Sequence, residues 1–207
     1  MRRSLLFLAF GIVAVSAAQT PKTLTDEVAK TWETLGPWTV SRDGGWIAAT
    51  VNRVEADGRL VVKKSDGTGT FEIPNGSGAI FSPDGRYVAY RLSPPRAVAE
   101  KLRNERKPVD TTLVLRSLAD GKETKVENAG SFRFLKTGPL VYRRTPAEGS
   151  KDNAAEMGLI VPATGETLVL PGVTDWAANK ADDLLAVATS TDRQTRSVVL
   201  LDPAIRT

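Results

Sequence analysis

Short apolar runs separated by turn-forming residues recur along most of this 207-residue chain. From Ala79 to Tyr90 the pattern is a strand, a tight turn and a second strand, with aromatic and β-branched residues on both sides. The turn, Ser82 to Gly85, contains a proline that presets φ, an aspartate that can bond nearby backbone amides, and a glycine that accepts a positive φ. Aromatic and β-branched residues suit a half-buried pleated surface, so the stretch predicts a β-hairpin.

This hairpin pattern occurs four times, and a second hairpin follows each of the first three copies. Two hairpins in every repeat of about 40–50 residues give four strands, which is the blade of a β-propeller. The four copies of the first hairpin are anchored on Ser41, Ser82, Leu135 and Asn179. The second hairpins turn at Asp66-Gly67, Asp120-Gly121 and Thr164-Gly165. Asp-Gly between apolar runs is among the stronger hairpin signals.

We therefore expect an all-β chain that forms a partial β-propeller of about four four-stranded blades, the last of them incomplete. The expected blades span about 38–75, 78–129, 130–173 and 174–207. The alternative is a β-sandwich, because sandwiches also carry short strands with turns roughly every 8–12 residues. The propeller is favoured since the repeats share the order of their elements and the positions of their aromatic residues.

The first 18 residues differ from the rest of the chain. Arg2 and Arg3 form a basic start, an apolar run spans Leu5 to Val15, and small residues follow. This pattern is typical of a secretory signal peptide, cut near Ala17 or Ala18. A membrane anchor is the alternative, but the apolar run is too short to span a hydrocarbon core of about 30 Å. The sequence thus predicts a secreted or periplasmic protein.

Residues 19–37 form the expected N-terminal helix and linker, which precede the propeller at 38–207. The helix is expected from Leu24 to Leu35, with Thr25 as its N-cap. We expect it to dock beside the first blade through one apolar face. That face would consist of Val28, Trp32 and Leu35.

Two longer segments interrupt the repeats. Arg91 to Thr111 breaks the second blade, and Ala97 to Arg106 within it has the composition of a basic, solvated helix. Arg143 to Glu156 is a second, polar excursion. Long insertions are usually functional or mobile, and a charged surface loop remains the alternative to a binding element.

The composition excludes most catalytic and metal chemistry. The sequence has no histidine and no cysteine, which rules out a Ser-His-Asp triad, a Cys-His pair, a disulfide and most zinc sites. Neither a G-x-S-x-G nor a G-x-x-x-x-G-K-[ST] motif occurs. The acidic pairs Asp26-Glu27 and Asp182-Asp183 fit a helix start and a turn. We therefore expect no catalytic, cofactor-binding or metal-binding residue.

The charge balance also limits the partners. The formal net charge of +4 becomes smaller when Arg2 and Arg3 leave with the signal peptide. Nucleic-acid binding would require a clear basic stripe, so no nucleic-acid partner is expected. No membrane span is expected after signal removal either.

Taken together, these features resemble the N-terminal propeller region of secreted serine peptidases of the prolyl oligopeptidase family. The resemblance rests on the signal peptide and on the segments 24–36, 38–52 and 57–90. It also rests on the Pro-Pro and Lys/Arg-rich insertion at 93–108, and so covers nearly the whole mature chain.

In that family the propeller lies over a C-terminal α/β-hydrolase domain, which supplies the catalytic Ser, Asp and His. The propeller limits access to this domain to peptides and partly unfolded chains. The resemblance therefore implies peptide substrates and a substrate-gating role, with no catalytic residue in this chain. Some relatives bind the amino terminus of the substrate with glutamates on a propeller insertion. Glu100 and Glu105 lie in such an insertion here, but no motif fixes either residue.

We expect a truncated propeller segment that is inactive alone, with an open edge in the last blade, which ends at Thr207. The alternative is a free-standing periplasmic propeller that binds a protein partner at that edge. A self-sufficient propeller should close its ring, which favours the fragment. Because an open edge also invites aggregation, a chain that folds poorly is a third possibility.

Overall fold

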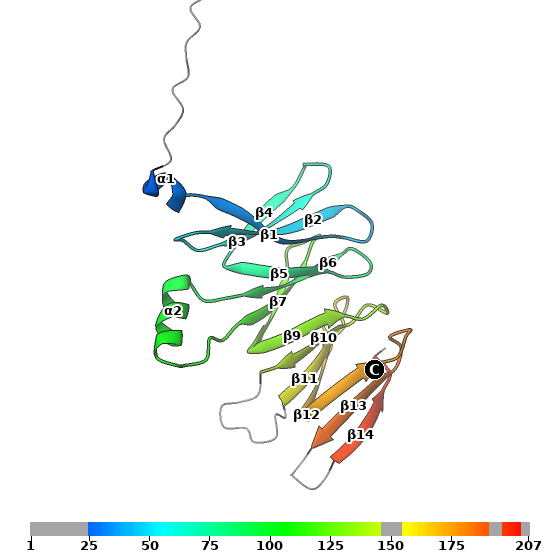
Figure 1. Ribbon diagram of the computed structural model, residues 1–207. Coiled ribbons are helices and arrows are strands. Elements are labelled where there is room, and N and C mark those ends of the chain that lie inside the picture. The colour runs from blue at the N-terminus through cyan, green and yellow to red at the C-terminus, as the bar shows by residue number, and fades with distance from the viewer. Residues whose placement is uncertain (1–24, 146–154, 191–195, 204–207) are drawn as a thin grey trace, which may run out of the picture.

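The computed structural model describes residues 25–145, 155–190 and 196–203 as a series of antiparallel β-sheets (Figure 1). Fourteen strands in these ranges form three sheets, and the strands of each sheet are ordered as in the chain. The expected all-β architecture is confirmed.

The first sheet holds β1 (Glu33–Val40), β2 (Trp46–Arg53), β3 (Arg59–Lys64) and β4 (Thr70–Pro74). The second holds β5 (Gly76–Phe81), β6 (Tyr87–Leu92), β7 (Thr112–Ser117) and β8 (Glu123–Glu127). The third holds β9 (Ala129–Phe134), β10 (Leu140–Arg144), β11 (Ala155–Ile160), β12 (Thr167–Ala178), β13 (Leu185–Ser190) and β14 (Arg196–Leu201).

The third sheet contains two blades that share the long strand β12. The first part of β12 pairs with β11 and the second part with β13, and the two parts meet at Val173. A register shift between Val173 and Asp175 follows this junction. The third blade therefore consists of β9, β10, β11 and the start of β12. The fourth consists of the end of β12 with β13 and β14, so three of its strands lie in the described part of the chain.

A single residue in the left-handed backbone conformation connects each blade to the next. These residues are Asn75 (φ 59°), Asn128 (φ 58°) and Gly172 (φ 68°). Glycine and asparagine adopt this conformation at the least steric cost, which explains their recurrence at the three junctions. The residue after each junction is buried, and at Gly76 a Cβ atom would lie 2.9 Å from Leu60 Cβ. The junctions thus bring the first strand of each following blade close against the preceding blade.

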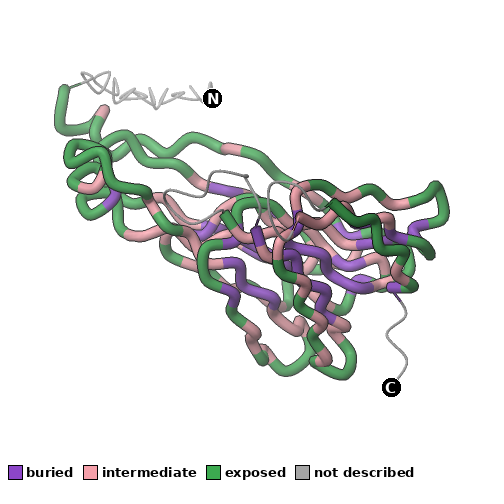
Figure 2. The backbone as a smooth tube through the Cα atoms, turned by 90° about the horizontal axis from the view of Figure 1, so that it is seen from below, coloured by how far each residue is buried: buried purple, intermediate pink, exposed green. Residues whose placement is uncertain are grey.

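The apolar core is divided among three clusters, each of which lies between two neighbouring blades. Figure 2 shows the buried segments gathered where the sheets face one another. Between the first and second blades, Ala48, Leu60 and Val62 pack with Val88, Tyr90 and Val114. Between the second and third, the cluster comprises Ala89, Leu113, Leu115, Val126, Ala129, Leu140, Tyr142 and Ile160. Between the third and fourth it comprises Leu135, Val141, Met157, Leu159, Val173, Leu185 and Val187.

The connections divide between two opposite edges of the sheets (Figure 1). The tight hairpin turns, such as 41–45, 82–86 and 135–139, lie at one edge, which we call the turn rim. The β2–β3 loop at 54–58 and the long connection at 93–111 lie at the other edge, which we call the insertion rim. The segregation follows from the antiparallel meander, because successive connections alternate between the two ends of the strands.

The first turns of the first two blades use the same side-chain chemistry. Ser41 Oγ donates to Asp43 Oδ1 at 2.5 Å and accepts from the Trp46 amide at 2.9 Å. In the second blade, Ser82 Oγ donates to Asp84 Oδ1 at 2.5 Å and accepts from the Tyr87 amide at 3.0 Å. The hairpins expected at these positions are therefore confirmed, together with the equivalence of their anchors.

The N-terminal helix is shorter than the sequence pattern predicts. Helix α1 spans Asp26–Lys30, and Thr25 caps it by accepting the Val28 amide at 3.4 Å. The chain then enters β1 at Glu33, because Glu33 to Leu35 pair with β2. Strand pairing satisfies these backbone groups and overrides the helical pattern. The expectation of an apolar docking face is wrong, since Val28, Trp32 and Leu35 are all exposed.

The helical insertion in the second blade is confirmed. Helix α2 spans Arg96–Asn104 and follows Pro95. Val98 is exposed, as expected for a solvated helix, but Ala99 is buried against the rest of the protein. Within the described residues, neither α1 nor α2 is long and apolar enough to cross a membrane. The expected signal peptide lies outside the described residues.

A glycine-to-alanine change tests the packing within the third blade. Gly158 lies opposite Tyr142, and a Cβ atom there would come within 2.0 Å of the Tyr142 ring. Because Tyr142 is buried, we expect Gly158→Ala to lower the free energy of unfolding by about 1–3 kcal/mol. Gly69→Ala is the control, since its nearest contact is the flexible Lys64 side chain at 3.5 Å. Urea titration measures both, and a Gly158 variant as stable as the wild type would contradict this packing.

Candidate functional site on the insertion rim

Two segments that are distant in sequence come together on the insertion rim. The β2–β3 loop at 54–58 belongs to the first blade, and α2 belongs to the connection that leaves the second blade. Pro94 and Pro95 have no backbone N–H to continue the strand pairing of β6, and α2 starts directly after Pro95, beside that loop. Loops held on a rigid scaffold are common places for binding residues.

Arg96 attaches α2 to the first blade. Its backbone N–H donates to Asp57 Oδ1 at 2.7 Å, and its guanidinium Nη1 donates to the Val54 carbonyl at 2.5 Å. The same guanidinium donates through Nε to Glu100 Oε1 at 2.6 Å, one turn further along α2. The contacts to Asp57 and Val54 fix the start of the helix against the β2–β3 loop, and the contact to Glu100 orients the Arg96 guanidinium. The insertion is therefore a docked element, although its outer face is solvated.

A polar cavity of about 250 Å³ lies between the first blade, the Asn75 junction and α2. Its lining combines side-chain amides, hydroxyls and guanidinium groups, which can donate several hydrogen bonds to one ligand. The polar lining side chains include Thr50, Asn52, Arg53, Asp57, Asn75, Ser77, Ser93, Arg96 and Arg103. A second hollow of about 450 Å³ adjoins it, lined by the 55–57 loop and by Pro95, Arg96, Ala97 and Glu100. The arrangement can bind and orient a polar ligand.

Glu33 holds the arginines beside this cavity. Arg59 donates to both carboxylate oxygens of Glu33, at 2.6 and 3.0 Å, and Arg53 Nε donates at 2.8 Å. Hydrogen bonds from Arg59, and then from Arg53, lower the pKa of Glu33 to about 2. Arg59 is also paired with Glu72 at 3.1 Å. This network fixes the orientation of Arg53, which lines the cavity.

The two glutamates of the insertion do not form a joint acidic site. Glu100 pairs with Arg96 and lines the second hollow. Glu105 follows the end of α2 and pairs with Lys107 at 2.8 Å. Each carboxylate thus has a cationic partner within the same insertion.

The paired acids have structural positions. Asp26 and Glu27 occupy the first turn of α1, where they favour the helix dipole. Asp182 is buried on the turn rim and links the last two blades, because it accepts from the Lys136 amide at 3.1 Å and from Arg133 at 3.2 Å. Burial alone would raise the pKa of Asp182, but these hydrogen bonds outweigh it and lower the pKa. In the described ranges, no cluster of three or more acidic side chains is placed to hold a metal ion.

Sequence reasoning missed the residues that build this site. Arg96 and Asp57 are 39 positions apart, and nothing in the local sequence around either residue predicts their contact. The helix expected at 24–35 includes Glu33, and that expectation conceals its pairing with Arg53 and Arg59 across the first sheet. The one available signal was the excursion itself, which is longer than the other connections between strands in its blade.

Comparison of the fold with solved structures identifies β-propellers. The β-propeller domain of the Trilobed protease from Pyrococcus furiosus superposes with a TM-score of 0.54 at 13% identity, over 83% of this chain and 55% of that domain. The Pyrococcus horikoshii acylaminoacyl peptidase gives 0.51 at 13% identity, over 85% of this chain and 32% of the peptidase. A prolyl endopeptidase gives 0.53 at 22% identity, over 83% of this chain and 27% of the enzyme.

These likenesses establish the fold. The expected propeller architecture is confirmed, and its structural neighbours include propeller domains of prolyl oligopeptidase-family peptidases. This chain spans about half or less of the length of each structure. Neither the protein-family models nor the curated proteins include a match to the sequence.

The Glu33 network gives a test by pH titration. We expect the Glu33 carboxyl to titrate with a pKa of about 2 in a carbon-detected NMR experiment, against about 4.3 for a free glutamate. Because folding lowers the pKa of Glu33, the network stabilises the fold at pH values above the pKa of a free glutamate. This stabilisation is lost as the pH falls towards the pKa of Glu33 in the folded protein. Arg59→Gln should raise this pKa more than Arg53→Gln, because Arg59 makes the larger contribution.

Lys63→Gln is the control for that titration, because Lys63 is a cation on the same sheet outside the network. It should leave the Glu33 titration unchanged. A Glu33 pKa in the ordinary range in the wild-type protein would contradict the geometry of the network.

Proposed function

We propose that this chain is the N-terminal part of a propeller that controls substrate access in a secreted serine peptidase of the prolyl oligopeptidase type. The propeller binds and admits peptide chains, and a separate hydrolase domain cleaves them. The chain itself contributes no catalytic residue, in keeping with a sequence that has no histidine.

The observation that carries the proposal is the docked insertion on one rim of the propeller. The insertion rim has a helix fixed by Arg96 and a polar cavity beside it. The opposite rim has short turns between the strands. A propeller with an insertion on one rim can contact a peptide chain that passes over that rim. Such contacts allow the propeller to select substrates.

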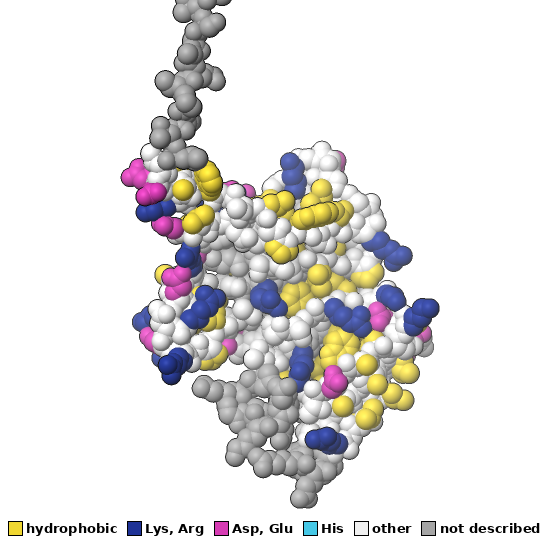
Figure 3. All heavy atoms as spheres, viewed as in Figure 1, with side chains coloured by type: hydrophobic (Ala, Val, Ile, Leu, Met, Phe, Trp, Pro, Cys, Tyr) yellow, Lys and Arg dark blue, Asp and Glu magenta, His cyan; other side chains and the backbone are white. Residues whose placement is uncertain are grey.

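The charge of the insertion indicates what it contacts. Figure 3 shows basic side chains gathered over α2. Lys101, Arg103, Arg106 and Lys107 are exposed, and Glu105 is the one acidic residue after Glu100 in this stretch. Arg103 also lines the polar cavity, and basic side chains favour the carboxylates of a peptide. The likeness to peptidase propellers supports the same class of ligand.

The first 18 residues support export of the protein. Their basic start, apolar run and small residues direct a chain to secretion, with cleavage near Ala17 or Ala18. N-terminal sequencing of the exported protein tests this part of the proposal. A mature protein that retains Arg2 and Arg3 would contradict it.

The peptidase proposal is tested by reading the DNA downstream of the codon for Thr207. We expect a frame, open or restored by one frameshift, that encodes further blades and then a G-x-S-x-G motif followed by Asp and His codons. A stop codon followed by an unrelated gene would contradict the proposal.

The gating role is tested in the longer protein by replacing residues 94–111 with a short Gly-Ser linker. We expect cleavage of an unfolded protein to rise relative to cleavage of a tetrapeptide, because only the larger substrate is held back by the insertion. Asp66→Asn on the turn rim is the control and should leave the ratio unchanged. An equal change for both substrates would contradict gating.

A protein-binding module is the second candidate, and a specific surface favours it. The outer face of the first blade carries Leu35, Trp38, Val40 and Ile47, which are 40–69% exposed. The strand register places them on one face, since Leu35 pairs with Val51, Trp38 with Ala49 and Val40 with Ile47. Exposed apolar faces of this kind mark contact surfaces. An unrelated downstream gene would make this the preferred function.

A further inference from the structure

The turns of neighbouring blades make direct contacts at two places on the turn rim. The Asp43 carboxylate of the first blade lies against Gly85 of the second, where a Cβ atom would be 3.1 Å from it. Between the third and fourth blades, Lys136 and Thr137 donate to Asp182, each at 3.1 Å. The turns thus close the rim at the first and third blade interfaces.

At the middle interface a cavity of about 350 Å³ separates the turns of the second and third blades. This volume is within the range of small-molecule sites, which begins at about 300 Å³. The lining is largely apolar, with Tyr87 on one side and proline and aliphatic side chains on the others. The ten lining residues are Ser82, Asp84, Tyr87, Thr137, Gly138, Pro139, Val161, Pro162, Ala163 and Pro203.

The lining has more acceptors than donors. Pro139, Pro162 and Pro203 have no backbone N–H, so three lining residues cannot donate to an anion. Asp84 is the one lining residue of the described chain with a formal charge, and it is negative. Its partner Arg86 lies 3.7 Å away with a side chain that is 76% exposed, which is a weak, replaceable ion pair. The ring face of Tyr87 also attracts cations.

We propose that this cavity is a binding site for an apolar or aromatic group that carries a primary ammonium. The apolar body lies among the prolines, Val161 and the Tyr87 ring, and the ammonium pairs with the Asp84 carboxylate. The site is independent of the proposed peptidase function and lies on the rim opposite the insertion.

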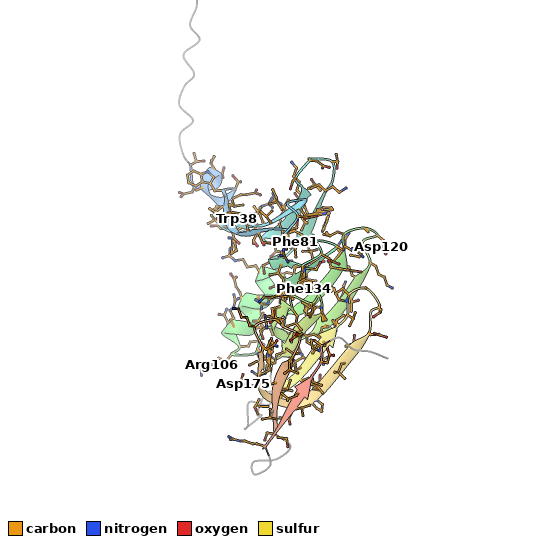
Figure 4. All side chains as sticks on the ribbon, turned by 90° about the vertical axis from the view of Figure 1, so that its right-hand side faces the viewer. Trp38, Phe81, Arg106, Asp120, Phe134 and Asp175 are labelled. Atoms are coloured by element: carbon orange, nitrogen blue, oxygen red, sulfur yellow. The ribbon has the colours of Figure 1, made fainter. Side chains whose placement is uncertain are left out.

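A smaller hollow on the turn rim adjoins this cavity along the same interface. It has a volume of about 190 Å³ and shares Tyr87, Pro162 and Ala163 with the first. Asp120 and Lys122 also line it, and Figure 4, in which the turn rim faces the viewer, shows Asp120 at the outer side of the second blade. A ligand longer than one ring can therefore extend from Asp84 towards Asp120.

Binding can be tested with three probes of matched size: 2-phenylethylamine, 2-phenylethanol and phenylacetate. With the ¹⁵N-labelled full chain, we expect the amine to shift the amide signals of Tyr87, Thr137 and Gly138 saturably, with a dissociation constant on the order of millimolar. The alcohol should bind about 2- to 5-fold more weakly, since it lacks the exposed ion pair. Phenylacetate should bind more weakly still.

Asp84→Asn tests the ammonium partner, because asparagine preserves the turn acceptor but removes the charge. We expect it to abolish the preference for the amine over the alcohol. Asp43→Asn is the matched control, since Asp43 has the same role in the turn of the first blade and does not line the cavity. It should keep the preference.

Ala163→Leu tests the cavity itself by filling it from an exposed turn position. We expect loss of binding for all three probes. Ala119→Leu, at the equivalent exposed position of the second blade, is the control and should bind normally. The proposal is overturned if the wild-type protein binds the amine and the alcohol equally, if no saturable shift occurs, or if Ala163→Leu binds as well as Ala119→Leu. The wild-type comparison and the Ala163 variant decide the matter even where Asp84→Asn does not fold.

Discussion

The structure depends on the apolar packing of each blade against its neighbours. A four-stranded sheet has two faces, and a single blade cannot bury both of them. The buried side chains accordingly form three clusters between blades, and the second and third blades contribute to two clusters each. The left-handed residues Asn75, Asn128 and Gly172 make this packing possible, because they turn the chain from one blade onto the next.

The same arrangement separates the two rims and gives them different chemistry. Antiparallel meanders place tight turns at one edge, where Ser41 satisfies a backbone amide of its own turn and Asp182 accepts a backbone amide across two blades. They place the loop at 54–58 and α2 at the other edge, where Arg96 joins them. The insertion rim therefore has a cavity lined by polar side chains, and the turn rim has a largely apolar cavity between the turns of the second and third blades.

Local chemistry made much of the fold predictable, and tertiary contacts explain the remainder. The turns at Gly44 and Gly85 require a positive φ, which the sequence indicates directly. The helical pattern up to Leu35 was misleading, because pairing with β2 is stronger than helix propensity at that point. The candidate site could not be predicted, since Arg96 meets Asp57 and Val54 only after two blades have packed. The continuity of β12 through two blades has no sequence signal either.

The most direct test of this account is native-state hydrogen exchange on an Ile160→Val variant. Ile160 is buried on β11 of the third blade and belongs to the cluster shared with the second. The substitution should cost about 0.5–1.5 kcal/mol. A shared core predicts that amide protection falls in β6 and β7 of the second blade as well as in β10 and β11. Loss of protection confined to the third blade would contradict it, and would show that each blade is stable by itself.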